Sequence, residues 1–134
     1  MTTGMARRFE LRILLWSWGL HIDLIARAVV GDNRDAVRIG SRSAVRPVAP
    51  IDQSDLDWLL RGFSRVAHQI DQAIAAGSEM VIEVLGLDYP LTDYQDDAIA
   101  LTAAVWAAEE FGFDAPEVDV QFDQGRNRYV IDYR

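Results

Sequence analysis

Hydrophobic and polar residues alternate along two stretches near the start of the chain. Every second position of the first stretch is apolar, at Phe9, Leu11, Ile13 and Leu15. Residues 20–30 alternate in the same way, and a period of two is typical of a strand with one buried face. We therefore predict strands over residues 9–16 and 20–30, although the second stretch also fits a helix. A turn over residues 31–35 and a short third strand over residues 36–39 follow.

A helical period replaces this alternation in the next segment. From residue 56 to residue 74 apolar side chains recur at i, i+3, i+4 and i+7, which predicts a long amphipathic helix. Asp52 or Ser54 is placed to cap its first turn, and Gly77 is placed to end it at residue 76. Residues 41–50 contain two prolines and show no periodicity, so we expect them to form a surface connection.

The second half of the chain contains a strand, a helix and a hairpin. Residues 80–86 form a short apolar run that is rich in β-branched residues, which predicts a central strand buried on most of both faces. Thr92 and Gln95 have the spacing of a capping box, and the residues that follow are apolar nearly all round. We expect a helix over residues 93–111, covered on more than one side, with Gly112 as its stop. Alternation over residues 118–122 and 129–133 predicts a C-terminal hairpin.

These elements predict a fold class. The order is three strands, helix, strand, helix and hairpin, so we expect an α+β fold whose mainly antiparallel sheet carries both helices on one face. With 134 residues, half of them hydrophobic, the chain should form a single domain over residues 1–134. No stretch is long and apolar enough to span a membrane, and charged residues interrupt the first apolar segment. We therefore expect no signal peptide, no membrane association and a cytoplasmic location.

The middle of the chain resembles a known family. The features concerned are the helix end Ile70-Asp-Gln-Ala-Ile-Ala-Ala-Gly77, the strand Val81-Ile-Glu-Val84, the Asp88-Tyr89 turn, an acidic helix start and a small-residue helix over residues 98–113. Over about residues 45–113 they are similar to the ribosomal protein S5 domain 2-like superfamily, in particular the fourth domain of elongation factor G. The resemblance implies a βββαβα core, a left-handed strand–helix–strand crossover, and association with RNA or the ribosome.

Charge is distributed unevenly along the chain. All 13 basic residues are arginine, and the formal net charge is −8. Residues 1–50 hold eight arginines against four acidic residues, whereas residues 51–134 hold five arginines against 17 acidic residues. Because affinity for nucleic acid depends on neutralising phosphates, this acid excess argues against nucleic acid as the main partner. It favours a protein partner that is itself basic.

The sequence contains no motif of an established active site. It lacks cysteine, a glycine-rich phosphate loop and the signatures of zinc proteases and serine hydrolases. Acidic residues surround the turn before the second helix, at Asp88, Asp93, Asp96 and Asp97. Their oxygens suit a divalent cation, but a helix N-terminus favours acidic residues in any case, so we expect neither a metal nor another cofactor. His21 and Asp23 share a strand face without a nucleophile nearby in sequence, which favours a structural role.

Arginine and tryptophan lie together near the first turn. Arg12 and Trp16 share a strand face, and Trp18 follows in the turn. This composition is typical of protein interfaces. Leu14 lies on the same face, opposite the helices, where apolar area is rarely left in water. We therefore predict a homodimer through the N-terminal sheet, with a second layer of this chain as the alternative cover.

Three hypotheses of function follow. The first is a non-catalytic protein–protein interaction or accessory module, of the kind that immunity proteins represent, with a contact surface at Arg12, Trp16, Trp18, Asp88, Asp93, Asp96 and Asp97. The second is the RNA- or ribosome-associated factor that the family resemblance implies. It would use the N-terminal arginines Arg7, Arg8, Arg12, Arg27, Arg38, Arg42 and Arg46. The third is a small metal-dependent enzyme.

Overall fold

A five-stranded sheet forms the base of the molecule. The computed structural model describes residues 4–15, 18–31 and 33–134. Along the sheet the strand order is β1 (Arg7–Leu15), β2 (Trp18–Val30), β5 (Met80–Asp88), β4 (Ser43–Pro47) and β3 (Val37–Arg38). Neighbouring strands are antiparallel except for β4 and β5, which are parallel. The α+β class and the mainly antiparallel sheet are confirmed, and β5 is the central strand.

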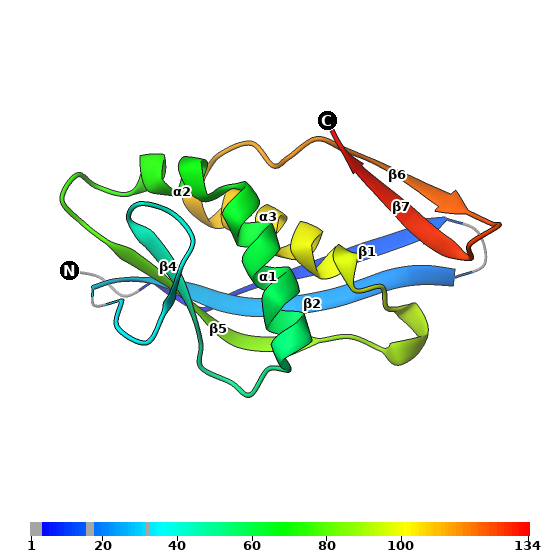
Figure 1. Cartoon of the computed structure of the whole chain (residues 1–134), viewed down its shortest axis with the longest axis horizontal. Coiled ribbons are helices and arrows are strands. Elements are labelled where there is room, and N and C mark those ends of the chain that lie inside the picture. Colours follow the sequence, from blue (N-terminus) through cyan, green and yellow to red (C-terminus); the bar gives the residue numbers. More distant parts are fainter. Residues whose placement is uncertain (1–3, 16–17, 32) are drawn as a thin grey trace.

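Helices cover one face of this sheet (Figure 1). They are α1 (Gln53–Arg65), α2 (Ala67–Ala73) and α3 (Asp97–Phe111), with a short 3-10 turn, η1 (Leu91–Asp93), before α3. The predicted C-terminal hairpin is confirmed as β6 (Val118–Asp123) and β7 (Arg128–Tyr133), which pair only with each other in the described part of the chain. The hairpin lies on the helix side, beyond the end of α3 that follows η1 (Figure 1).

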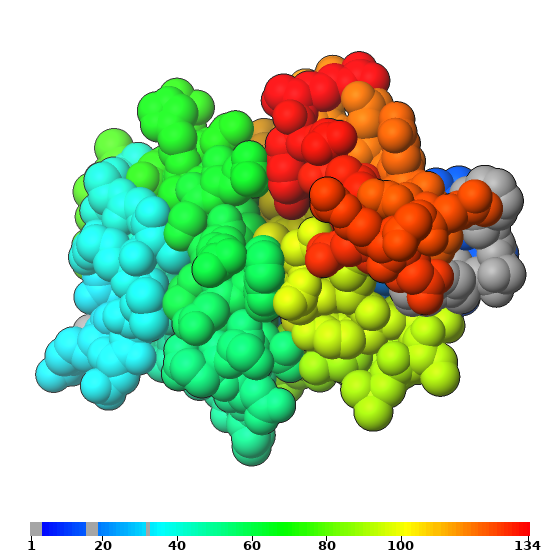
Figure 2. Space-filling model, turned by 45° about the vertical axis from the view of Figure 1, so that its right-hand side comes forward, coloured from blue at the N-terminus to red at the C-terminus, as the bar shows by residue number. Residues whose placement is uncertain are grey.

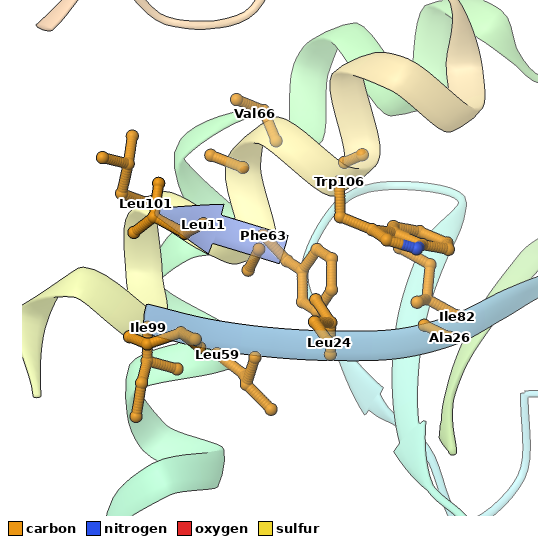
Figure 3. Packing of buried hydrophobic residues seen from close by; sticks show 14 of the residues in the cluster. Leu11, Leu24, Ala26, Leu59, Phe63, Val66, Ile82, Ile99, Leu101 and Trp106 are labelled. Carbon is orange, nitrogen blue, oxygen red and sulfur yellow. The ribbon is translucent and has the colours of Figure 1, made fainter. Parts of the chain in front are cut away.

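The alternation in β1 and β2 explains why the core lies on one face. In β2 the even-numbered residues from Leu20 to Ala28 are buried, whereas the residues between them are half-buried on the other face. Trp106 points from α3 toward the sheet, close to Ala26 and Ile82, and its side chain is fully buried (Figure 3). Phe63 of α1 contacts its ring edge to face, with centroids 6.1 Å apart. Helices and sheet therefore share one apolar core.

The structure corrects the prediction for residues 41–50. This segment contains β4, a strand whose first three residues, Ser43, Ala44 and Val45, are buried between β5 and β3. A strand that is buried on both faces shows no alternation, and Pro47 at its end disguised it further. The third strand is also shorter than predicted, spanning only Val37–Arg38.

The long helix predicted for residues 53–76 is divided in two. Val66 has non-helical backbone angles between α1 and α2, and the second helix ends at Ala73 instead of residue 76. The helical period of the apolar side chains continues through Val66, so the sequence pattern does not reveal the boundary between α1 and α2. Helix α2 ends earlier than predicted because of a residue from another part of the chain. Arg42 lies just before β4, and its guanidinium group donates to the carbonyls of Asp71, Ile74 and Ala75. Arg42 thus supplies hydrogen-bond donors to carbonyl groups at the C-terminal end of α2, which would otherwise lack a partner within the helix.

Asp71 on α2 holds the turn between β3 and β4. Its carboxylate accepts hydrogen bonds from the Ser41 amide at 2.9 Å, the Ser41 hydroxyl at 3.0 Å, the Ser43 hydroxyl at 2.8 Å and the Arg42 amide at 3.3 Å. Burial alone would raise the pKa of Asp71, but these hydrogen bonds outweigh it and hold the pKa below its usual value.

We expect Asp71→Asn to lower the free energy of unfolding by about 2 kcal/mol at neutral pH, because hydrogen bonds to a charged group are lost. Because the pKa of Asp71 is lower in the folded protein than in the unfolded chain, its carboxylate contributes its full stabilisation at pH values above the unfolded pKa. This stabilisation is lost as the pH falls through the folded pKa. The difference between the native protein and the variant should therefore shrink below about pH 4 in urea titrations. Asp114→Asn, at an exposed position, is the control. A difference that stays constant down to acid pH would contradict this role.

The start of α3 also differs from the prediction. Thr92 lies in η1, and the helix begins at Asp97, where Asp96 accepts from the Asp97 amide at 2.7 Å. Gln95 does not complete a capping box. Its side chain is buried against β7, donating to the Tyr129 carbonyl at 2.7 Å and accepting from the Tyr129 amide at 2.8 Å. Gly112 ends the helix in the left-handed conformation, as predicted.

Candidate functional site

The start of α1 and the end of β5 enclose a hollow of about 240 Å3, lined by Pro50, Ile51, Asp52, Asp55, Leu87, Asp88 and Tyr89. We call it the acidic hollow, after its three carboxylates. Asp52 is the N-cap residue of α1, and Asp55 lies in the first helical turn, where the helix dipole favours an acidic residue. The crossover from β4 to the parallel strand β5 brings these two residues beside Asp88.

Two tyrosines hold the buried carboxylate of Asp55. Asp55 as a whole is 8% exposed. The Tyr89 hydroxyl donates to one of its oxygens at 2.9 Å, and the Tyr94 hydroxyl donates to the other at 3.4 Å. The two tyrosine rings are stacked, with centroids 3.9 Å apart and planes 13° apart. Tyr89 thus lines the hollow with Tyr94 stacked on it, and both hydroxyl groups are directed at Asp55.

The protonation of these tyrosines follows from their surroundings. Burial and the nearby Asp55 carboxylate raise the pKa of Tyr89. Burial, together with Tyr89 and Asp55, raises the pKa of Tyr94 further. Both phenols therefore remain protonated donors at neutral pH, so they orient the negative charge of Asp55 without cancelling it.

The carboxylates of the acidic hollow have no cationic partner among the described residues. Asp52 and Asp88 are exposed and form no side-chain ion pair there, and the partners of Asp55 are the two neutral phenols. Nor do three or more side chains of the metal-binding types gather closely enough, anywhere in the described ranges, to hold a metal ion. The carboxylates of the hollow therefore carry negative charge that no cationic side chain of the described residues neutralises.

A second hollow, of about 300 Å3, adjoins the first and shares Asp88 and Tyr89 with it. Arg8, His21 and Asp23 from the open face of the sheet line its other side. Here the charges are compensated, because the Arg8 side chain donates to Asp23 at 2.7 Å. The uncompensated part of this surface is therefore the acidic hollow.

The four acidic residues of the predicted contact surface have different surroundings in the structure. Asp88 lines the acidic hollow. Asp93 lies in η1, and Asp96 caps α3. Asp97 pairs with Arg128 of β7 at 3.1 Å and accepts from Gln95 at 2.6 Å. The acidic site at this end of the molecule thus combines Asp88 with Asp52 and Asp55, rather than with the acids that follow it in sequence.

The predicted arginine–tryptophan surface is only partly described. Arg12 is exposed and donates to Glu10 through two nitrogens, at 2.9 and 2.7 Å. Trp16 and the side chain of Trp18 lie outside the described residues. Leu14 is 74% exposed, on the face of the sheet away from the helices. Homodimerisation through this region stays a prediction.

The N-terminal arginines that an RNA-binding role would require are engaged within the fold. Arg7 pairs with Glu109 and Arg38 with Glu79. On the open face of the sheet, Glu83 bridges Arg27 at 2.7 Å and Arg46 at 2.8 Å, and these contacts lower the pKa of Glu83, with Arg46 contributing most. Arginines that already pair with carboxylates gain less free energy from binding phosphates, which argues against the hypothesis of an RNA- or ribosome-associated factor.

Sequence reasoning missed Asp55, Tyr94 and the grouping around them. From the sequence, Asp52 is expected only to cap a helix, and Asp88 is expected to group with the acidic residues that follow it. A signal was nevertheless present: Asp55 interrupts the apolar face of a helix, one position before Leu56. An acidic residue directed into the protein needs hydrogen-bond donors, and Tyr89 and Tyr94, which follow β5 in sequence, supply them.

No protein-family model matches this chain, and no curated protein is significantly similar to it. In the parts of the chain that the structure describes, no helix combines the length and the apolar composition that a membrane crossing needs.

Proposed function

We propose that this protein is a non-catalytic interaction module, of the accessory or immunity type, that binds a basic protein partner at the acidic hollow. The observation that carries the proposal is the group of three carboxylates around one hollow without a cationic partner in the described chain. The bound group is an arginine side chain of the partner.

Guanidinium chemistry suits this hollow better than a metal ion or an ammonium group. A guanidinium is planar and has five donors, so it can donate to more than one carboxylate of the hollow at once. It can also lie against the Tyr89 ring, which lines the same hollow. Arginine is weakly hydrated compared with lysine, so less free energy is lost when it leaves water.

Capture of the partner from the native host tests the proposal. The native protein should recover a basic protein at about 50 mM salt and lose it at about 500 mM, because screening shortens the range of the attraction. The double variant Asp52→Asn/Asp88→Asn should recover little or none of it at either salt concentration. A partner that is bound equally by this variant, or bound without regard to salt, would contradict the proposal.

The matched control is Asp114→Asn/Asp132→Asn. It removes the same two negative charges from exposed positions outside the hollow. If net charge alone attracts the partner, both double variants should lose it equally. Loss from the first variant alone assigns the binding to the acidic hollow.

We further propose that the fold belongs to the ribosomal protein S5 domain 2-like superfamily. Supporting this, β4 and β5 are parallel neighbours joined by a crossover through α1 and α2, and α3 follows β5. Four strands precede α1; if the two-residue strand β3 is left aside, the remaining order is in line with the βββαβα core that the family resemblance implies. An experimental structure with a right-handed crossover would contradict the assignment.

A further inference from the structure

A separate groove of about 180 Å3 lies between α1, the start of α3 and β7. The side chains that matter here are Trp58, Arg61, Arg65, Asp97, Ile131 and Tyr133, and we call this site the arginine groove. Figure 2 shows the elements that form it, with the hairpin in orange and red lying against the green of α1 and the yellow of α3. Its size is below the roughly 300–1,000 Å3 of pockets for drug-sized ligands, so it suits a small molecule.

Both arginines of the groove lie over aromatic rings. Arg61 lies 4.4 Å from the centre of the Trp58 ring, and Arg65 lies 3.6 Å from the centre of the Tyr133 ring. Most other arginines of the described chain form an ion pair with a carboxylate. Among the described residues, Arg61 and Arg65 form no such ion pair. The rings fix the two guanidinium groups in place and leave their N–H donors unused by any carboxylate.

The charge balance selects a singly charged anion. The two arginines supply two positive charges, one helical turn apart on α1. Asp97 also lines the groove and supplies one negative charge, so the lining carries a net charge of +1; its carboxylate also pairs with Arg128 of β7 at 3.1 Å. Nearby negative charge on Asp97 disfavours a doubly charged phosphate, and the aromatic rings and Ile131 favour an apolar body.

We propose that the arginine groove binds a small organic carboxylate with an aromatic or apolar body. The carboxylate accepts from the Arg61 and Arg65 guanidinium groups, and the body contacts Trp58, Tyr133 and Ile131. This site is independent of the acidic hollow, since the two share no lining residue.

Nuclear magnetic resonance titration of the full chain with phenylacetate tests this site. The Trp58 indole and the Ile131 amide should shift and saturate, whereas neutral phenylacetamide at the same concentrations should cause little change. Arg61→Gln and Arg65→Gln should each raise the Kd at least roughly tenfold, the loss expected for a charge-assisted hydrogen bond. Arg126→Gln, which removes an arginine outside the groove, should leave the Kd unchanged.

Four results would overturn the proposal. The first is a phenylacetate titration that fails to saturate, and the second is equal binding of the amide. The third is an unchanged Kd in both Arg61→Gln and Arg65→Gln. Tighter binding of inorganic phosphate than of phenylacetate would also refute the assignment to a singly charged carboxylate.

Discussion

Replacing Gly62 with alanine should lower the free energy of unfolding by about 3 kcal/mol, although alanine is the better helix former. Gly62 lies in α1 where that helix contacts α3. A Cβ atom at Gly62 would overlap the Ala100 carbonyl oxygen and lie 2.8 Å from two other Ala100 backbone atoms. Backbone atoms cannot rotate away as a side chain does, so the helices must move apart and weaken the core between them.

Urea denaturation followed by circular dichroism measures this effect. Ser64→Ala is the matched control, because it places alanine at an exposed position of the same helix and should change stability by less than about 0.5 kcal/mol. The intrinsic preference of a helix for alanine over glycine, about 1 kcal/mol, acts in the opposite direction. A Gly62→Ala variant as stable as the native protein would show that α1 and α3 do not approach as closely as described.

Trp106→Ala should be at least as damaging, with an expected loss of about 4 kcal/mol. The side chain is fully buried, and its ring contacts Phe63 and Phe111 edge to face. Its indole N–H also donates to the Arg7 carbonyl at 2.9 Å, which joins α3 to the start of β1. The variant therefore creates a cavity and leaves a carbonyl without this donor.

Trp106→Phe separates these two contributions. It retains an aromatic ring in the core but cannot donate to the Arg7 carbonyl, so we expect an intermediate loss. Leu91→Ala, at an exposed position, is the control for removing an apolar side chain, and it should have little effect. A loss below about 1 kcal/mol for Trp106→Ala would contradict the central place of this residue in the core.

The elements that the sequence predicts well are those with a local pattern. Strands β1 and β2 each have one buried face, so alternation reveals them, and Gly112 marks the end of α3 by its positive φ angle of 77°. Strand β4 is buried on both faces and therefore shows no alternation. The end of α2 depends on Arg42, which is distant in sequence, so no local signal places it.

The same limit applies to the acidic hollow. Asp88 was recognised as a candidate residue, but its partners Asp52 and Asp55 come from another element, and only the crossover between β4 and β5 brings them together. Local reasoning grouped Asp88 with Asp93, Asp96 and Asp97 because they are close in sequence. Asp96 caps α3, the role that a helix start favours, and only the ion pair of Asp97 with Arg128 of β7 depends on tertiary structure.

The most direct test of the proposed function is a titration with a defined arginine peptide, acetyl-Gly-Arg-Gly-Arg-Gly-amide, followed by nuclear magnetic resonance. The amides of Asp52, Asp55, Asp88 and Tyr89 should shift and saturate, more strongly at low salt. The matching lysine peptide should bind more weakly, because an ammonium group cannot bind two carboxylate oxygens in the same bidentate way.

Asp52→Asn/Asp88→Asn should abolish this saturable binding, whereas Asp114→Asn/Asp132→Asn should retain it. Shifts scattered over exposed acidic residues, without saturation and equal in the two double variants, would contradict binding at the acidic hollow.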